Sequence, residues 1–259
     1  MRLKIFLGVV LASLIAVGVV AADPKNDFQV KPGEFKPEKT PLVNGAWLNS
    51  LGCPTNAKTA VYNSTFTDTN PGPPYTDPAC PTGDDKDKKV EGLLLNKTGP
   101  TSNAAAAGAE IKGLKKDTVL TELGWDIRKP NNTGDARGSH CGAGSPRWNI
   151  IARDSSGNEN FFFIGCNSPP PTTQTNGGGF IRERWGGGSN PVLAAPAGPG
   201  LCPGPAPAGT CNLTGLQVKF IEIVMDEGQD TGPDNFGLAI LDNIDINGTL
   251  VGRGPTDPS

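Results

Sequence analysis

The chain has 259 residues, a formal net charge of −3, six cysteines, 35 glycines and 25 prolines. Its one short basic run, Lys86-Asp87-Lys88-Lys89, is offset by the neighbouring Asp84 and Asp85. The sequence therefore lacks the clustered positive charge that binds a phosphate backbone, and we expect no nucleic-acid partner. The length fits one large β domain.

Residues 1–22 have the pattern of a secretory signal peptide. A basic start at Arg2 and Lys4 precedes an apolar run over residues 5–20, which ends in Ala21 and Ala22. Because the run is shorter than the ~20 residues of a membrane-spanning helix, cleavage after Ala22 is favoured over anchoring. We therefore expect a secreted, extracellular protein with no membrane span after cleavage.

Residues 23–45 are polar and proline-rich, with no sustained hydrophobic period, which predicts an extended polar leader. The fold is expected to start near Ala46 and to continue as a single β-sandwich domain over residues 46–254, followed by a short tail at 255–259. Proline-rich segments at 69–83, 168–179 and 190–210 are expected to be long surface loops, because proline disfavours helices and central strands.

Short runs rich in aromatic or β-branched residues lie between these loops, and each predicts a strand. The runs are 90–95, 109–111, 118–127, 147–153, 160–165, 217–225 and 238–246. Turn-forming residues at 154–158 predict that 147–153 and 160–165 form a hairpin. Residues 103–110 could form a helix, but Gly108 and the short length limit it to a turn or two. The pattern predicts an all-β, jelly-roll-like sandwich with long Pro/Gly-rich loops.

The six cysteines all follow the predicted signal peptide. An even number in an oxidising compartment predicts three disulfides, and the absence of Cys-x-x-Cys or Cys-x-x-His spacing disfavours zinc. Pairing of successive cysteines is favoured, because each bond would then close one local Pro/Gly-rich segment. The expected bonds are Cys53–Cys80, Cys141–Cys166 and Cys202–Cys211.

Residues 225–248, MDEGQDTGPDNFGLAILDNIDING, are rich in carboxylates. Calcium takes oxygen ligands from Asp, Asn and backbone carbonyls, so an acidic, glycine-rich loop predicts a structural Ca²⁺ site. An EF-hand is excluded, because Gly237 stands where the twelfth position requires Glu. The alternative is a solvated loop in which Asp and Gly form turns. The predicted metal ligands are Asp226, Asp230, Asp234 and Asp242.

Residues 215–252, with an apolar strand, the acidic loop and the closing LDNIDING, resemble the last two strands of galactose-binding-like jelly rolls. Many secreted carbohydrate-binding modules use this sandwich. Asp242, Asn243 and Ile244 match the Asp-Asn-Ile step that the final strand often carries in that family. The resemblance implies a jelly-roll sandwich, a structural calcium ion near one of its ends, and a carbohydrate ligand. We recognise no family over residues 46–214.

Sugar binding requires aromatic faces that stack on pyranose rings. Trp185 lies between Arg184 and a glycine run, so we expect it to be the exposed tryptophan, with Arg182 and Arg184 as hydrogen-bond donors beside it. The alternative is a tryptophan buried under its own loop. The other aromatic candidates are Trp47, Trp125, Trp148, Tyr62 and Tyr75, of which Trp125 and Trp148 are expected in the core.

Catalytic interpretations have less support, and we assign no catalytic residue. Glu222 and Asp226 share one face of a strand, but their spacing of roughly 13 Å exceeds the ~5–9.5 Å of a glycosidase pair. His140, the single histidine, lies beside Cys141 in a glycine-rich segment without a nucleophile elbow. We therefore expect a secreted, non-catalytic binding module with a glycan ligand. The alternatives are a secreted enzyme acting on polysaccharide and a purely structural extracellular domain.

Overall fold

The computed structural model describes residues 28–37, 39, 41–53, 83–84, 86–102, 104–129, 144–166, 168–175, 180–198, 202, 206–226 and 236–255. Within these ranges the chain forms only β-strands as regular elements. They are β1 (Gln29–Phe35), β2 (Val43–Leu48), β3 (Gly92–Thr98), β4 (Ala106–Lys112), β5 (Glu122–Arg128), β6 (Arg147–Arg153), β7 (Glu159–Gly165), β8 (Thr172–Thr175), β9 (Ile181–Gly186), β10 (Leu193–Pro196), β11 (Cys211–Asn212), β12 (Gln217–Met225), β13 (Phe236–Ile246) and β14 (Thr249–Val251).

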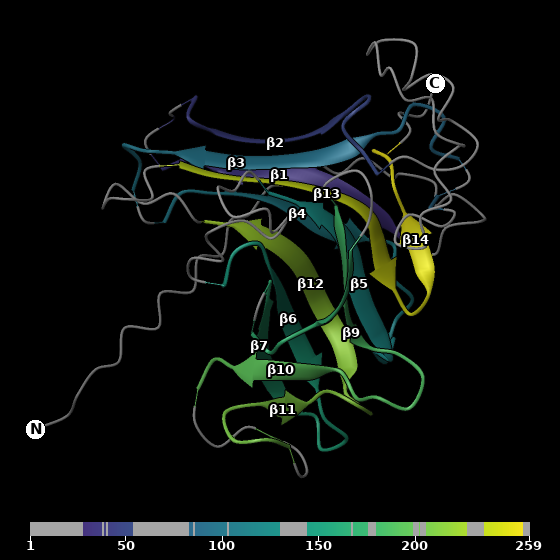
Figure 1. The fold of residues 1–259 in the computed structure, drawn as a ribbon. Coiled ribbons are helices and arrows are strands. Elements are labelled where there is room, and N and C mark those ends of the chain that lie inside the picture. The colour runs from purple at the N-terminus through teal and green to yellow at the C-terminus, as the bar shows by residue number, and fades with distance from the viewer. Residues whose placement is uncertain are drawn as a thin grey trace, which may run out of the picture.

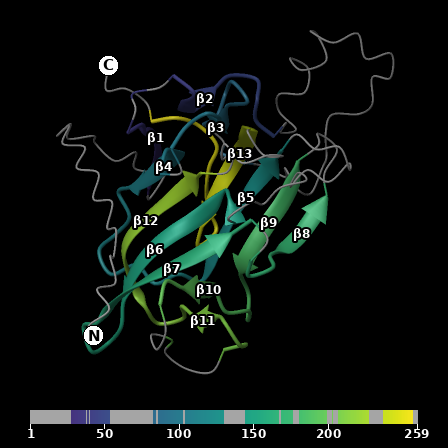
Figure 2. The ribbon, with the colours of Figure 1, turned by 90° about the vertical axis from the view of Figure 1, so that its left-hand side faces the viewer.

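The strands form two antiparallel sheets that pack as a sandwich, which confirms the predicted fold class. Sheet A has the order β1-β4-β12-β6-β7-β10-β11. Sheet B has the order β2-β3-β13-β5-β9-β8, and β14 pairs with β13. Figure 2 shows β12, β6 and β7 side by side in one layer and β5, β9 and β8 side by side in the other.

The core forms where alternate residues of both sheets point inward. Trp148 of β6 and Trp125 of β5 come from opposite sheets and stack with ring centroids 5.1 Å apart and planes 16° from parallel. Trp185 of β9 meets Trp125 edge-on, also at 5.1 Å. All three indoles are buried. Since large aromatic side chains bury the most apolar surface, this cluster joins the two sheets at their centre.

The hairpin of β6 and β7 is confirmed, and its turn explains why the chain reverses there. The Asp154 carboxylate accepts hydrogen bonds from the backbone N–H groups of Ser156 and Asn158, at 2.8 and 2.9 Å. These bonds hold the pKa of Asp154 below its ordinary value, with the largest contribution from the side chain of Asn158. Gly157 supplies the left-handed residue of the turn, with φ of 88°.

The extended leader predicted over residues 23–45 is wrong for its described part. Residues 29–35 form β1 and residues 43–45 begin β2, each at one edge of a sheet. Phe28, Val30 and Val43 are buried in the core, although polar residues surround them in the sequence. An edge strand tolerates Pro32 because one side of its backbone has no strand to pair with. The sandwich therefore includes residues before Ala46.

Three further segments differ from the sequence-based expectation. Residues 106–112 form β4, which confirms the strand predicted at 109–111 and extends it over the residues where a helical turn was considered. Only a residue as small as Gly108 fits there, because an added Cβ would lie 2.6 Å from the carbonyl oxygen of Ile223 on β12. The proline-rich segments 168–179 and 190–210 contain β8 and β10. β8 is the last strand of sheet B, and β10 is the last but one of sheet A, beside the two-residue β11. Near a sheet edge proline removes few of the hydrogen bonds between strands.

The disulfide Cys202–Cys211 is present, as predicted. It joins the first residue of β11 to Cys202, in the segment between β10 and β11. Cys53 and Cys166 are also disulfide-bonded. Cys80 and Cys141 lie outside the described residues, so the expected pairings Cys53–Cys80 and Cys141–Cys166 stay predictions.

Candidate functional site

The two sheets approach each other at the edge formed by β1 and β2. Figure 1 shows β1 of sheet A running beside β2 of sheet B. Trp47 on β2 bridges the two edges, because its indole Nε1 donates a hydrogen bond to the carbonyl oxygen of Val30 on β1, at 3.0 Å. The indole is only half-buried, unlike the three tryptophans of the core.

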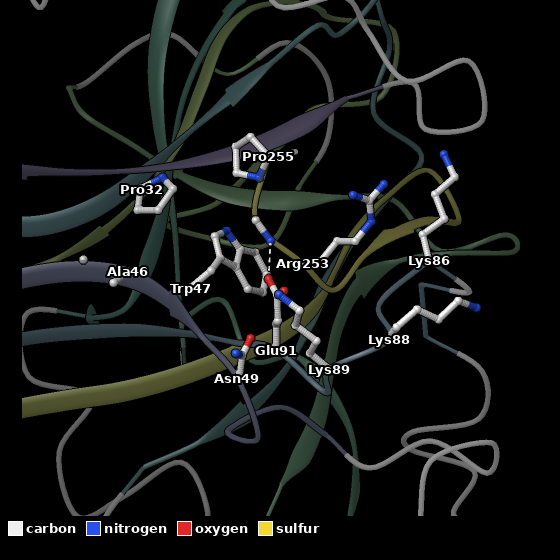
Figure 3. A pocket seen from close by; sticks show the side chains of 12 residues that line it. Pro32, Ala46, Trp47, Asn49, Lys86, Lys88, Lys89, Glu91, Arg253 and Pro255 are labelled. Atoms are coloured by element: carbon white, nitrogen blue, oxygen red, sulfur yellow. Dashed lines mark hydrogen bonds between the residues drawn. The ribbon is translucent and has the colours of Figure 1, made fainter. Parts of the chain in front are cut away.

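A pocket of about 720 Å³ opens beside Trp47. This volume lies within the ~300–1,000 Å³ range of small-molecule sites. Figure 3 shows Pro32, Ala46, Trp47 and Pro255 on one side of it, and Lys86, Lys88 and Arg253 on the other. The residues that line the pocket are Pro32, Gly45, Ala46, Trp47, Asn49, Lys86, Lys88, Lys89, Glu91, Arg253, Gly254 and Pro255.

Two contacts hold the segment after β14 against this pocket. The backbone N–H of Gly254 donates to the Glu91 carboxylate at 2.9 Å. The Arg253 guanidinium pairs with the buried carboxylate of Asp84, with Nε and Oδ2 3.2 Å apart. Gly254 packs directly on the indole, since a Cβ there would lie 3.1 Å from Cδ1 of Trp47. The pocket therefore has a fixed wall made of residues that lie far apart in the sequence.

Asp242 lies in a second polar cluster, on the outer face of sheet B. Its carboxylate accepts the backbone N–H groups of Cys53 and Asn243, both at 2.6 Å. Asp126 stands directly opposite it on β5. Burial raises the pKa of Asp242 well above its ordinary value, and the charge of Asp126 raises it further. Gly52 and Gly252 cover this carboxylate, each so close that a Cβ would lie 2.7 Å from one of its oxygens.

Two of the four predicted calcium ligands, Asp226 and Asp242, lie in the described residues and have different surroundings. The Asp226 carboxylate binds the Arg147 guanidinium through both oxygens, at 2.6 and 2.7 Å. Lys97 donates to the carbonyl oxygen of Asp226 and pairs with Gly237 on β13. Asp242 lies five residues beyond Gly237, which is roughly 17 Å along a strand. A single site therefore does not include both Asp226 and Asp242.

Asp230 and Asp234 lie outside the described residues, so a metal site that uses them stays a prediction. Within the part of the chain that the structure describes, no group of three or more His, Cys, Asp or Glu side chains is placed to hold a metal ion. His140, Tyr62 and Tyr75 also fall outside it.

The structure buries Trp185 and Arg182 of the predicted sugar-binding group, so the expected exposure of this tryptophan is wrong. The Trp185 indole is 3% exposed and donates to the carbonyl oxygen of Pro169 at 2.8 Å. Arg182 is also buried, and its guanidinium donates to Asp245 at 2.8 Å. Arg184 is half-exposed and pairs with Glu122. The inward positions of β9 place Trp185 in the core, while the two arginines point to the outer face and bind carboxylates there.

The outer face of sheet A brings together two acids that the sequence separates. Glu110 on β4 stands directly opposite Glu222 on β12. Asn149 donates to the Glu222 carboxylate at 3.0 Å, and Lys112 pairs with Glu110. Burial raises the pKa of Glu222, and the charge of Glu110 adds to this effect, while the Asn149 hydrogen bond opposes it.

Comparison with family models, with curated proteins and with solved structures returned no match for this chain. The resemblance of residues 215–252 to galactose-binding-like modules therefore stays an expectation from a short motif. Over the described ranges, no helix has the length and hydrophobicity needed to cross a membrane.

The sequence offered Trp47 as one aromatic candidate among several, and nothing in its neighbourhood distinguished it. The sequence placed Trp47 at the boundary between the predicted leader and the predicted domain. The contact between β1 and β2 was therefore not expected. The lysines of the pocket were set aside because their acidic neighbours balance them in the sequence.

Proposed function

We propose that this chain is a secreted, non-catalytic binding module for a glycan, and that the pocket beside Trp47 is its binding site. The observation that carries this proposal is the indole of Trp47, which packs against the core and is only partly buried, in a pocket of about 720 Å³ with polar groups along its rim. A pyranose ring has apolar C–H faces that pack on an indole, while its hydroxyls require donors and acceptors nearby.

Two features support an extracellular setting for this function. The disulfide Cys202–Cys211 is the kind of bond that persists in oxidising compartments. The first 22 residues have the charge and hydrophobicity of a signal peptide, as described above. Secretion is part of the proposal, and its direct test is N-terminal sequencing of the protein recovered from the medium of expressing cells.

Substitution of Trp47 tests the proposed site. Wild type and Trp47→Ala are compared on a glycan array and then by titration calorimetry with the glycans that bind. Loss of an aromatic anchor costs about 2 kcal/mol, so we expect Trp47→Ala to weaken binding by at least about tenfold. Trp47→Phe keeps an aromatic ring and should retain most of the affinity.

Leu48→Ala is the matched control, because Leu48 is the next residue on β2, is 39% exposed and does not line the pocket. Its affinity should equal that of wild type. Unfolding curves of all variants separate loss of binding from loss of the fold. Unchanged glycan binding by a folded Trp47→Ala protein would contradict the proposed site.

The cross-strand pair Glu110 and Glu222 favours a second candidate function, hydrolysis of a polysaccharide. Directly opposite residues have Cβ atoms about 4.5–5.5 Å apart. A retaining glycosidase needs two carboxyls about 5–5.5 Å apart, one of them an acid of raised pKa. Glu222, whose pKa is raised, would be that acid. Release of reducing sugar by wild type that disappears in Glu222→Gln would establish this function, and no release by wild type would reject it.

A further inference from the structure

The outer face of sheet A carries large apolar side chains that the core does not use. Alternate residues of β6, β7 and β12 point inward, among them Trp148, Phe162 and Ile221. Their neighbours point outward, where polar residues are the usual occupants. Four of the outward residues are instead large and apolar, and they are partly buried without belonging to either buried cluster of the described chain. They are Ile151, Phe161, Phe163 and Phe220, which we call the apolar strip.

Pairing between the strands places the apolar strip in a line across the sheet. Phe220 on β12 stands opposite Ile151 on β6, and Ile151 stands opposite Phe161 on β7. Phe163 lies two residues further along β7, with its ring centroid 4.6 Å from that of Phe161. Figure 2 shows these three strands side by side. Since neighbouring strands lie ~4.8 Å apart, the line crosses about 10 Å of sheet.

A row of polar side chains runs beside the apolar strip. Glu110, Glu222 and Asn149 stand opposite one another on β4, β12 and β6, and Phe163 continues the row on β7. Asn149 donates to the Glu222 carboxylate at 3.0 Å and so holds it in place. A ligand on the strip therefore has apolar side chains beneath it and hydrogen-bond acceptors along one side.

Contacts within the face hold the aromatic rings before any ligand binds. The Arg147 guanidinium lies 5.7 Å from the centre of the Phe163 ring and binds both carboxylate oxygens of Asp226. Phe163 in turn packs against Phe161, with ring planes 60° apart. Because these side chains are already ordered, binding to them costs little side-chain entropy.

The apolar strip is small for a protein partner. A phenylalanine offers about 150–250 Å² when its whole side chain is buried. The side chains of the strip are already partly buried, so together they present on the order of a few hundred Å². A specific protein–protein interface buries about 800 Å² on each partner. The dimensions suit one narrow chain that crosses the strands.

The strands of sheet A, which are described throughout, carry balanced charge. Ion pairs account for most of their charged side chains: Lys36–Glu34, Lys112–Glu110, Arg147–Asp226, Arg153–Glu159 and Lys219–Asp117. Lys31 and Glu222 add one charge of each sign. These strands therefore favour neither an anionic nor a cationic ligand.

We propose that the apolar strip is a second carbohydrate-binding surface, which takes a neutral polysaccharide chain running across β12, β6 and β7. The C–H faces of the sugar rings pack on Phe220, Ile151 and Phe161, and hydroxyl groups along the edge of the chain donate to the carboxylates of the polar row. The inference takes its ligand class from the proposed function, but it concerns a different face from the pocket beside Trp47.

The test uses ¹⁵N-labelled Trp47→Ala protein, in which the pocket beside Trp47 has lost its aromatic ring. It is titrated with neutral hexasaccharides of glucose, xylose, mannose and N-acetylglucosamine. We expect at least one of them to cause saturable shifts of the backbone amide signals of Ile151, Phe161 and Phe220. Adding Phe161→Ala should weaken this binding by about fivefold or more, and salt should change it little.

Two further variants control for loss of the fold. Phe161→Tyr keeps the aromatic ring and should bind as its parent does. Leu48→Ala removes an apolar side chain of greater exposure from β2, on the other sheet, and should also leave the affinity unchanged. Urea unfolding of each protein shows whether Phe161→Ala is folded under the conditions of the titration.

The outcomes separate the second surface from the proposed pocket. Equal affinity with and without Phe161→Ala, in folded protein, would overturn the second surface and leave the pocket standing. Loss of all binding in Trp47→Ala, when wild type binds, would do the same. Binding of none of these sugars by wild type would overturn both.

A second copy of this chain is the competing occupant of the apolar strip. Sedimentation velocity of wild type and Phe161→Ala distinguishes it from a sugar chain. We expect both proteins to have the same association state. A wild-type dimer that dissociates in Phe161→Ala would overturn the proposal, and so would tighter binding of polygalacturonate than of every neutral hexasaccharide.

Discussion

At the scale of single residues, Glu222 is a partly buried carboxylate whose pKa is raised by its surroundings. Burial raises its pKa, and the Glu110 carboxylate on the neighbouring strand raises it further, against the Asn149 hydrogen bond and the charge of Arg147. Because the pKa is higher in the folded chain, the folded state keeps the proton at pH values where the unfolded state has released it. The contribution of Glu222 to stability is therefore present at low pH and decreases as the pH rises from the ordinary value of 4.5 to the raised value.

Glu222→Gln should remove this loss of stability at higher pH. Glutamine keeps an oxygen that accepts from Asn149, and it carries no charge to desolvate. We expect the variant and wild type to have similar unfolding free energies near pH 3.5 and the variant to be more stable at about pH 8. The gain should be below about 1 kcal/mol, because the side chain is partly exposed and solvent screens its charge. Urea unfolding across this pH range measures it, and parallel pH curves would contradict the assignment.

At the scale of the elements, the loops that contain Gly52 and Gly252 pack closely on Asp242 of β13, and this close packing requires glycine at both positions. An added Cβ at Gly52 would lie 2.2 Å from the carbonyl oxygen of Glu91 and 2.7 Å from Oδ2 of Asp242. We expect Gly52→Ala to lower the unfolding free energy by about 1–3 kcal/mol, since overpacking of a closed contact has this cost. Gly33→Ala on β1 is the control, because nothing lies within 4 Å of a Cβ there. Equal melting temperatures of the two variants would show that the loops do not pack as described.

The strands whose bounds could be predicted from the sequence are those whose inward residues are mostly large and apolar. β6 and β12 have the predicted bounds because their inward positions carry residues such as Trp148, Ile150 and Ile223. β9 escaped prediction because Glu183 occupies an inward position, where its carboxylate accepts from the Trp125 indole at 2.7 Å. β4 was predicted only over residues 109–111, because its inward residues are mostly alanines, which also suit a helix. Pairing with strands distant in the sequence determines whether such segments form strands, and the local sequence pattern does not show this pairing.

At the scale of the whole molecule, the candidate site is a product of topology. Its lining comes from β1, β2, the segment before β3 and the segment after β14, which meet only when the edges of the two sheets adjoin. No window of the sequence contains this set, so composition and motifs directed attention to the acidic loop and Trp185 instead. The fold class could be predicted from the sequence, because strand patterns are local. The pocket could not be predicted from the sequence, because it forms only when the two sheets pack together.

The central claim is that Trp47 contacts the glycan, and the NMR signals of the four tryptophan indole N–H groups test it directly. Protein labelled with ¹⁵N is titrated with an oligosaccharide from the glycan that binds best. The account predicts a saturable shift of the Trp47 indole signal, with little change for Trp125, Trp148 and Trp185, which are buried in the core. A Trp47 signal that stays in place at saturating sugar, or shifts confined to the Glu110–Glu222 face of sheet A, would contradict it.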